Sequence, residues 1–538
     1  MSHSVPYSLI NSPIHLLIPM SGQGTRYKAA GYTDPKPMIP VSGVPMISRL
    51  LRNFPESWPA HFVMAENHQQ TLLPEWLKKK CPRGTQDYVA VHSYGPGHAI
   101  LEGLKSIPED EAVFVSYCDY GMVWDSYQFE SFVRSTGCDA CIVSYRGFHA
   151  HYLSPVTYAY SRIKNGRVVE VKEKGSFTSD RESEFASSGG YYFRTAKMLR
   201  EAIDYQKSHQ IKFNEEYYTS LTVQSLLQKN PESDVRVFEI PGFFQWGTPE
   251  DLKKFEFWEK SYRYALRYRG CSLEVAQVLM PMAGQGSRFK SLFSLPKPLI
   301  SIQGKPMFSQ ALATLPQAQH TVAVVLESIQ DQLLEWKKEN AHCQFISLKE
   351  TPSGQALSVQ AGISSLIPEK ELIVSSCDHG IVLDPKIWEK FRLNPDCDAA
   401  IFTVKGYPGA DRNPGSFAYV IPESEQDLSL VREVSVKVPV SGIPSQDHLL
   451  VGTFWFKNSK ILDLGIEEVK SKNIRVNGEL YLDSVFECLI KKGFRVKMIP
   501  LDGYLCWGDP DSLAEALYWE EIFSGCLMVK RPRFPEMN

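Results

Sequence analysis

Residues 14–47 read IHLLIPMSGQGTRYKAAGYTDPKPMIPVSGVPMI, and residues 278–308 read VLMPMAGQGSRFKSLFSLPKPLISIQGKPMF. Each stretch begins with an apolar run, passes into a glycine-rich loop and continues to a Pro-Lys-Pro segment. An apolar strand that runs directly into a glycine loop is typical of nucleotide-binding α/β domains. The repeat therefore predicts two copies of one such domain.

The similarity extends along both halves of the chain. FVSYCDYGMVWD corresponds to IVSSCDHGIVLD, SSGGYYF to LVGTFWF, FNEEYYTSL to VNGELYLDS, and FQWGTPEDL to LCWGDPDSL. A period this long indicates duplicated domains rather than a solenoid, and 538 residues exceed the roughly 250–300 residues of a single core. We expect domains of residues 1–269 and 270–538, each with a mostly parallel mixed sheet, divided after the helical run EFWEKSYRYALRYRG.

Composition narrows the class of protein. The formal net charge of −3 argues against a polyanionic partner, so we expect no nucleic acid. No apolar run reaches the roughly 18 residues of a membrane span, and the 11 cysteines follow no disulfide framework. We therefore expect a cytoplasmic protein with small-molecule partners, whose two domains pack as an intrachain pseudo-dimer.

The glycine loops suit phosphate. Residues without Cβ let successive backbone N–H groups approach phosphate oxygens, and an arginine at the end of the loop adds a forked donor. The loop lacks the third glycine of a dinucleotide fingerprint and the Gly-Lys-Ser/Thr of a Walker loop. It therefore predicts a triphosphate cradle, formed by Gly22, Gln23, Gly24 and Arg26 in the first copy and by Gly284, Gln285, Gly286 and Arg288 in the second.

Lys36 and Lys297 each lie between two prolines. Proline restricts the backbone around the ammonium group, and a preorganised cation can neutralise phosphate charge in a transition state. The order G-x-G-x-R, P-K-P and then G-x-P-M resembles the signature of the sugar-1-phosphate nucleotidyltransferases. The resemblance covers nearly all of both halves and implies tandem Rossmann-like, GT-A-like domains. It also implies that an acceptor phosphate attacks the α-phosphorus of an NTP and releases pyrophosphate.

The resemblance implies Mg²⁺ bound by Asp119 and Asp378, which each follow an apolar strand. The family usually has a second aspartate two residues before a late Gly-Thr, where this chain has Gln245 and Cys506. The number of metal ions therefore stays open. Carboxylates that are candidates to substitute for it are Asp125, Asp251, Asp384 and Asp511.

The acceptor side is less alike in the two copies. Glu173, Lys174 and Gly189 resemble family positions that hold the sugar phosphate, and the second copy keeps Lys437 but has Val436 in place of the glutamate. Gly97 and Gly354 resemble the loop that recognises the base, without identifying the base. We expect the copies to differ in their acceptors.

Three alternatives stay open. A GT-A glycosyltransferase has the same nucleotide-binding α/β core but requires a D-x-D metal motif, which is missing at the ends of these strands. One copy, more readily the C-terminal one, is a candidate for a non-catalytic partner. The Gly-Tyr-x-x-Pro-Lys-Pro form at residues 31–37 also resembles that of related capsule-type enzymes, which implies CTP-dependent activation of a non-sugar phosphorylated metabolite as a further alternative.

Overall fold

The computed structural model describes residues 12–90, 94–155, 158–393 and 395–528. It divides into two compact units, which we call unit 1 (residues 1–256 with 521–538) and unit 2 (residues 257–520). The division falls inside two long helices, α9 (Pro249–Arg267) and α17 (Pro510–Met528). The predicted boundary at residues 269/270 lies in the connection between α9 and the first strand of unit 2.

Unit 1 is built on a nine-stranded sheet. Its strands are β1 (Ile14–Met20), β4 (Ala60–Ala65), β5 (Thr85–Val89), β6 (Ala112–Val115), β8 (Ala140–Tyr145), β9 (Tyr160–Lys164), β10 (Arg167–Lys172), β11 (Phe185–Phe193) and β12 (Val235–Glu239). β1 pairs in parallel with β4 and β6, whereas β11 runs antiparallel to β6 and β8. Short ribbons pair β2 (Pro40–Val41) with β3 (Val44–Pro45) and β7 (Tyr120–Val123) with β13 (Gly242–Gln245).

Unit 2 repeats this topology with a second nine-stranded sheet. Its strands are β14 (Glu274–Pro281), β17 (Gln317–Leu326), β18 (Cys343–Leu348), β19 (Leu372–Ser375), β21 (Ala399–Val404), β22 (Ala418–Pro422), β23 (Val431–Val436), β24 (His448–Phe456) and β25 (Val496–Pro500). β14 takes the place of β1, between β17 and β19, and β24 takes the antiparallel place of β11. The ribbons are β15 (Ser301–Ile302) with β16 (Lys305–Pro306) and β20 (His379–Val382) with β26 (Gly503–Cys506). The predicted α/β fold with a mixed sheet in each half is confirmed.

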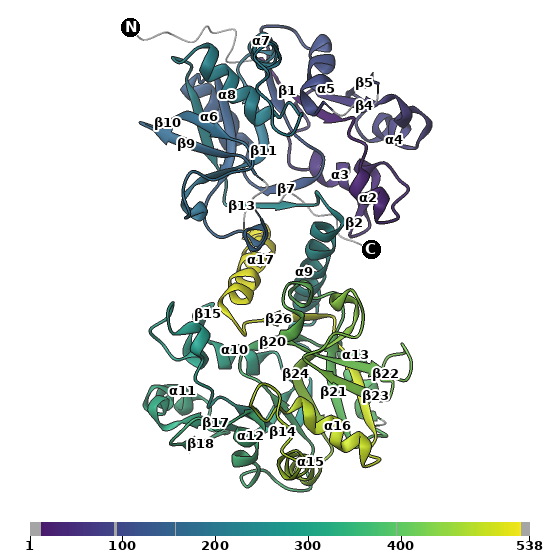
Figure 1. Ribbon diagram of the computed structural model, residues 1–538, viewed down its shortest axis with the longest axis vertical. Helices are drawn as coiled ribbons and strands as arrows, with labels where there is room; N and C mark the ends of the chain where they lie inside the picture. Colours follow the sequence, from purple (N-terminus) through teal and green to yellow (C-terminus); the bar gives the residue numbers. More distant parts are fainter. Residues whose placement is uncertain (1–11, 91–93, 156–157, 394, 529–538) are drawn as a thin grey trace. The chain divides into compact units, whose positions relative to one another are not determined.

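Helices pack on these sheets (Figure 1). In unit 1 they are α2 (Thr25–Ala29), α3 (Met46–Leu51), α4 (Leu73–Lys80), α5 (Pro96–Gly103), α6 (Ser126–Thr136), α7 (Ala196–Ser208) and α8 (Thr219–Lys229). In unit 2 they are α10 (Met307–Ala313), α11 (Leu334–Glu339), α12 (Gln355–Ile363), α13 (Pro385–Leu393), α14 (Pro408–Arg412), α15 (Ser459–Ser471) and α16 (Asp483–Lys491). α5 packs on β1, β4 and β5, and α12 packs on β14 and β17 in the same manner.

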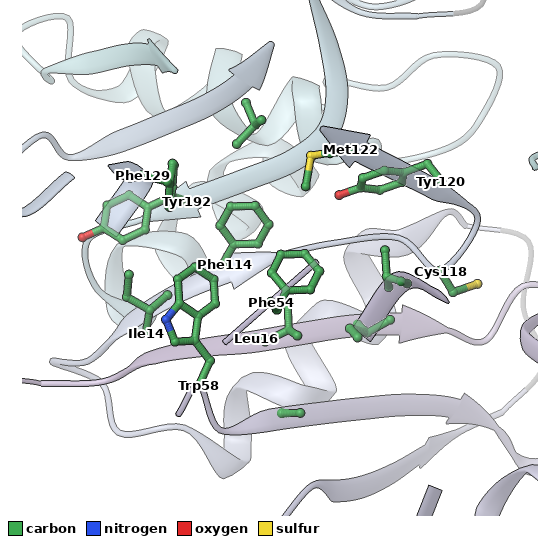
Figure 2. Close-up of a cluster of buried hydrophobic side chains, with 14 of the residues drawn as sticks. Ile14, Leu16, Phe54, Trp58, Phe114, Cys118, Tyr120, Met122, Phe129 and Tyr192 are labelled. Atoms are coloured by element: carbon green, nitrogen blue, oxygen red, sulfur yellow. The ribbon is translucent and has the colours of Figure 1, made fainter. Parts of the chain in front are cut away.

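An aromatic cluster fills one side of the unit 1 sheet. Phe54, Trp58, Phe114 and Phe129 are buried, with ring centroids 5.4–6.3 Å apart in the pairs Phe54–Phe114, Trp58–Phe129 and Phe114–Phe129. Figure 2 shows these rings gathered beside Leu16 of β1. Burial of such rings contributes apolar area and favourable edge-to-face contacts. The core therefore holds β1 and β6 firmly, and both strands lead into the candidate site.

Candidate functional site

The glycine loop follows the central strand in each unit. Gly24 and Gly286 have left-handed backbones, with φ of +62° and +57°, a conformation that glycine adopts without steric cost. A Cβ on Gly286 would also lie 2.7 Å from Cβ of Lys297. Glycine is therefore required where the loop passes the Pro-Lys-Pro segment.

The Pro-Lys-Pro lysine meets the strand-end aspartate in both units. The Lys36 Nζ donates to Asp119 Oδ2 at 2.5 Å, and the Lys297 Nζ donates to Asp378 Oδ2 at 2.6 Å. A late glycine carbonyl accepts a second bond from each lysine, at 3.1 Å from Gly247 and 3.0 Å from Gly508. The structure thus brings together residues that lie more than 80 positions apart along the chain.

Electrostatics stabilise this pair in its charged form. Burial acts to lower the pKa of Lys36 and of Lys297, but the neighbouring aspartate charge outweighs it and each pKa lies above the ordinary lysine value. Burial acts to raise the pKa of Asp378, yet Lys297 and His379 hold that pKa well below its usual range. Cleft 2 therefore contains an ammonium–carboxylate pair at neutral pH, and Lys36 of cleft 1 is likewise an ammonium group.

Sequence reasoning missed the aromatic residue next to each loop arginine. Tyr27 donates its hydroxyl to the carbonyls of Trp246 and Thr248, at 2.7 and 2.9 Å, which ties the loop to the late glycine segment. Its ring lies 5.7 Å from the Lys36 Nζ, and Phe289 lies 5.3 Å from the Lys297 Nζ. The recurrence of an aromatic residue after the arginine in both copies was the available signal.

Each unit carries a cleft at this place. Cleft 1, in unit 1, has a volume of about 370 Å³, and its predicted residues are Gly22, Gly24, Arg26, Lys36 and Asp119. Gln23 lines a smaller adjoining cavity of about 110 Å³. Cleft 2, in unit 2, has a volume of about 580 Å³, and its predicted residues are Gly284, Gln285, Gly286, Arg288, Lys297, Gly354 and Asp378.

The predicted acceptor lysines share an unusual backbone. Lys174 and Lys437 have φ of +50° and +63°, which is uncommon for residues with a Cβ. The Lys174 Nζ donates to the Tyr218 hydroxyl at 2.7 Å. The Lys437 Nζ lies 5.1 Å from the ring of Tyr481, the repeat counterpart of Tyr218. Neither lysine is among the described residues that line the two clefts, but the charge of Arg288 acts on Lys437.

Other predicted positions lie around the clefts. Glu173 accepts a hydrogen bond from Ser220, and burial raises its pKa. Gly189 has φ of +92°, and a Cβ there would lie 3.1 Å from the Tyr117 ring. Gly97 lies in the first turn of α5 and donates its N–H to the Tyr217 carbonyl at 3.3 Å. Of the two glycines predicted to lie in the base-recognition loops, Gly354, at the start of α12, lines cleft 2. Gly97 is not among the described residues that line cleft 1.

The side chains around Gly247 and Gly508 show whether a metal ion fits beside each strand-end aspartate. A methyl group on Gly247 would lie 3.7 Å from Asp119 Oδ2, 3.6 Å from Asp251 Oδ2 and 3.8 Å from Gln245 Oε1, so three oxygens face one point. A methyl group on Gly508 would lie 3.6 Å from both Asp378 Oδ2 and Cys506 Sγ. Oxygen donors suit Mg²⁺, so cleft 1 offers the better donor set.

The remaining candidate carboxylates are occupied at helix starts. Asp125 accepts from the backbone N–H groups of Tyr127 and Gln128, and Asp384 accepts from that of Lys386. Asp511 lies in the first turn of α17. Within the described ranges no three His, Cys, Asp or Glu side chains converge as a metal site. Asp251 also accepts hydrogen bonds at a helix start, from Thr248 and Gln245, but it is the candidate that lies beside Asp119.

The MobA-like NTP transferase domain family matches residues 16–175 and 278–422 of this chain, which is more than half of its length. The chain belongs to this family. The two matched segments begin at the glycine-loop strand of each unit, so this NTP transferase is a tandem nucleotidyltransferase. No curated protein sequence matches it.

Solved structures similar to the NTP transferase each cover about half of it. A nucleoside-diphosphate-sugar pyrophosphorylase from Vibrio cholerae RC9 is 20% identical and covers 45% of this chain and 99% of its own, with a TM-score of 0.37. An inositol-1-phosphate CTP transferase from T. maritima is 15% identical and covers 46% and 96%, with a TM-score of 0.37. A UTP-bound UGPase from Acinetobacter baumannii is 16% identical and covers 48% and 100%, with a TM-score of 0.36. No helix in the described part of the NTP transferase is long and apolar enough to cross a membrane.

Proposed function

We propose that this nucleotidyltransferase transfers a nucleoside monophosphate from an NTP to a phosphorylated acceptor, most simply a sugar 1-phosphate, and releases pyrophosphate. The supporting observation is that a glycine loop, an arginine and a lysine–aspartate pair line one cleft in each unit of a chain from the NTP transferase family.

The chemistry needs positioning and charge neutralisation rather than a protein nucleophile. The acceptor phosphate is already an anion, and one of its oxygens forms a bond to the α-phosphorus while the bond to the β-phosphate oxygen breaks. The loop N–H groups and Arg26 hold the triphosphate, and Lys36 balances the charge that develops on it. Arg288 and Lys297 have the same roles in cleft 2.

Mg²⁺ is the proposed cofactor, and when bound it would neutralise triphosphate charge. Asp119, with Gln245 and Asp251 beside it, would hold the ion in cleft 1, and Asp378 would hold it in cleft 2. Lys36 and Lys297 bond to these aspartates. Each lysine can then turn to the triphosphate when the aspartate takes a cation.

Lys174 and Lys437 are the proposed contacts for the acceptor phosphate, since the tyrosine beside each lysine holds it at a fixed place. Two narrower alternatives belong to the same proposal. The acceptor is a non-sugar phosphorylated metabolite activated with CTP, or cleft 2 binds ligand without turnover.

A matrix of four NTPs against several phosphorylated acceptors, with Mg²⁺ and with pyrophosphate as the readout, tests the proposal. We expect pyrophosphate release with one base and a narrow set of acceptors, and transfer of label from α-labelled NTP into the product. The same matrix with the Lys36→Ala/Lys297→Ala double variant is the control. Absence of label transfer for every pair would overturn the enzymatic proposal.

A further inference from the structure

The wall of each cleft beside the strand-end aspartate differs between the units. Tyr117 lines cleft 1 next to Cys118 and Asp119, and its repeat counterpart in cleft 2 is Ser376, next to Cys377 and Asp378. The serine lacks the aromatic ring that forms part of this wall in unit 1. Cleft 2 has a volume of about 580 Å³, against about 370 Å³ for cleft 1 and about 110 Å³ for the cavity that adjoins cleft 1.

The Tyr117 ring closes one end of cleft 1. Its hydroxyl bonds to Thr219 Oγ1 at 2.8 Å, at the first residue of α8, and its ring lies against the backbone of Gly189. The ring therefore bridges the cleft wall, the bulged strand β11 and α8. These are the segments that carry the proposed acceptor contacts of unit 1.

Unit 2 has no aromatic ring at this place. Ser376 Oγ accepts a hydrogen bond from Gln355 Nε2 at 2.7 Å, and Gln355 also lines the cleft. Leu482 takes the position of Thr219 and is fully buried, so unit 2 has no hydroxyl at this position. Ser376 and Gln355 therefore give cleft 2 a small polar wall where cleft 1 has the tyrosine.

The carboxylate near the proposed acceptor lysine also belongs to a different element in each unit. In unit 1, Glu173 follows β10 and bonds to Ser220 of α8. In unit 2, Val436 ends β23, and the counterpart of Ser220 is Asp483, the first residue of α16. The charge of Asp483 acts on Lys437, so each unit keeps one carboxylate near its lysine, but on opposite elements.

Asp483 is poised to bind a ligand group. Its side chain is half-buried, and within the described part of the chain its carboxylate accepts no hydrogen bond, whereas Glu173 is already bonded to Ser220. The Asp483 oxygens are not among the buried side-chain atoms that lack a partner in the described part of the chain, so water reaches them. A hydroxyl or amino group of an acceptor can take the place of that water.

We infer that the two clefts take different acceptors: cleft 1 takes a smaller phosphorylated acceptor bounded by Tyr117, and cleft 2 takes a bulkier one whose hydroxyl or amino group is read by Asp483. This inference rests on the proposed function. It makes Tyr117 and Ser376 the determinants of acceptor size, and Glu173 and Asp483 the determinants of hydrogen-bond pattern.

The test isolates each cleft in the full chain. Lys297→Ala leaves cleft 1 as the active site and Lys36→Ala leaves cleft 2, and both variants are assayed with phosphorylated pentoses, hexoses, N-acetylhexosamines and polyols. We expect the two variants to prefer different acceptors, with cleft 2 favouring the larger ones by about 10- to 100-fold in kcat/KM. Pyrophosphate release by neither variant would instead count against the proposed function.

Exchange of the wall residues then assigns the cause. In the Lys36→Ala variant, where only cleft 2 is active, Ser376→Tyr is expected to lower kcat/KM for the larger acceptors by at least about tenfold. In the Lys297→Ala variant, where only cleft 1 is active, Tyr117→Ser is expected to raise kcat/KM for the same acceptors. Asp483→Asn keeps the shape and is expected to raise KM about tenfold with a smaller change in kcat. Tyr127→Ser and Asp427→Asn, at exposed positions away from the clefts, are the matched controls.

The outcomes distinguish failure of this inference from failure of the proposed function. Identical acceptor preferences in the two isolated clefts would overturn the inference, as would turnover by one cleft alone, while either result leaves the proposed function intact. Ser376→Tyr adds bulk and can misfold, so the inference also needs a variant that keeps the shape of the side chain. Asp483→Asn is that variant, and an unchanged KM would overturn the role of Asp483.

Discussion

Units 1 and 2 build their glycine loop, arginine and lysine–aspartate pair from equivalent strands and with nearly equal distances. They differ in two other places: a tyrosine of the cleft 1 wall corresponds to a serine in cleft 2, and the carboxylate near the proposed acceptor lysine belongs to a different element in each unit. The constant half suits a ligand part that is the same in both units, and the triphosphate is such a part. The variable half suits a ligand part that differs, as an acceptor does. The two units therefore agree at the glycine-loop side of the site and differ at the side that carries the proposed acceptor contacts.

The strongest test of this comparison is removal of the shared aspartate from one unit at a time. Asp119→Ala and Asp378→Ala are each expected to lower turnover in their own cleft by about 10²–10³-fold, because each removes the partner of a lysine and a cation oxygen. Pyrophosphate release with each cleft's preferred acceptor is the measurement. Asp110→Ala and Asp427→Ala are controls at exposed positions. Unchanged turnover after one of the substitutions would mark that unit as non-catalytic.

A second test concerns acid stability, where the units differ at the base of the sheet. His15 Nδ1 and His61 Nε2 lie 2.8 Å apart in unit 1, whereas Gln277 and Val322 occupy the equivalent strand positions in unit 2. Burial, with a contribution from the His15 charge, lowers the pKa of His61 to about 4. The unfolded chain therefore takes up protons first as the pH falls below about 6.5, and unit 1 loses up to about 3 kcal/mol by pH 4.

Hydrogen exchange of the full chain between pH 7 and pH 4, resolved by peptide, checks this prediction. Peptides of β1 and β4 are expected to lose protection before peptides of β14 and β17, after correction for the intrinsic pH dependence of exchange. His61→Val imitates unit 2 and is expected to remove the difference. Equal loss of protection in both units would contradict the assignment to the histidine pair.

A third test concerns the cation. Cleft 2 has Cys506 where cleft 1 has Gln245, and burial raises the pKa of that thiol, so it stays protonated. Cys506→Asp adds an oxygen donor beside Asp378 and is expected to raise the affinity of cleft 2 for Mg²⁺ or Mn²⁺ about tenfold. Calorimetric titration of the metal alone is the measurement, and Cys271→Asp, at an exposed position of unit 2, is the control. An unchanged affinity would show that Cys506 does not limit cation binding.

The smallest expected effect lies at the helix that follows each late glycine. In unit 1 the Thr248 hydroxyl and the Asp251 carboxylate exchange bonds with each other's backbone N–H, and in unit 2 Asp509 accepts from the Ser512 N–H and hydroxyl. The capping carboxylate belongs to the third helical residue in unit 1, and to the residue before the helix in unit 2. Asp509→Ala is expected to destabilise unit 2 by about 1 kcal/mol, and Asp511→Ala by less, in urea unfolding. Equal effects of the two substitutions would contradict the capping role.

Much of the fold and of the triphosphate end could be predicted from local patterns. The apolar run that opens the first quoted stretch forms β1 (Ile14–Met20), and the helical run EFWEKSYRYALRYRG lies largely in α9 (Pro249–Arg267). Apolar runs, glycines and prolines act within a few residues of their own position. The roles assigned to the loop, lysine and aspartate residues stay predictions until the variants are measured.

The acceptor end could not be predicted in the same way. The replacement of Glu173 by Val436 indicated a loss of a carboxylate, but Asp483 lies 47 positions further along the chain and restores one beside Lys437. Tyr117 is recognised as the end of cleft 1 only because its hydroxyl meets Thr219 of α8. Such contacts join segments that have no local relation in the sequence.

The presence of one nucleotide-binding domain in two copies follows from the sequence alone, because repeated glycine, proline and apolar positions impose their own local geometry. The sequence also shows which lysine and aspartate residues recur in both copies. The tertiary structure shows that these residues pair, that a tyrosine lines one cleft where the other has a serine, and that the carboxylate whose charge acts on Lys437 belongs to α16. Those features depend on which side chains packing brings to the same point, and packing is a property of the folded chain.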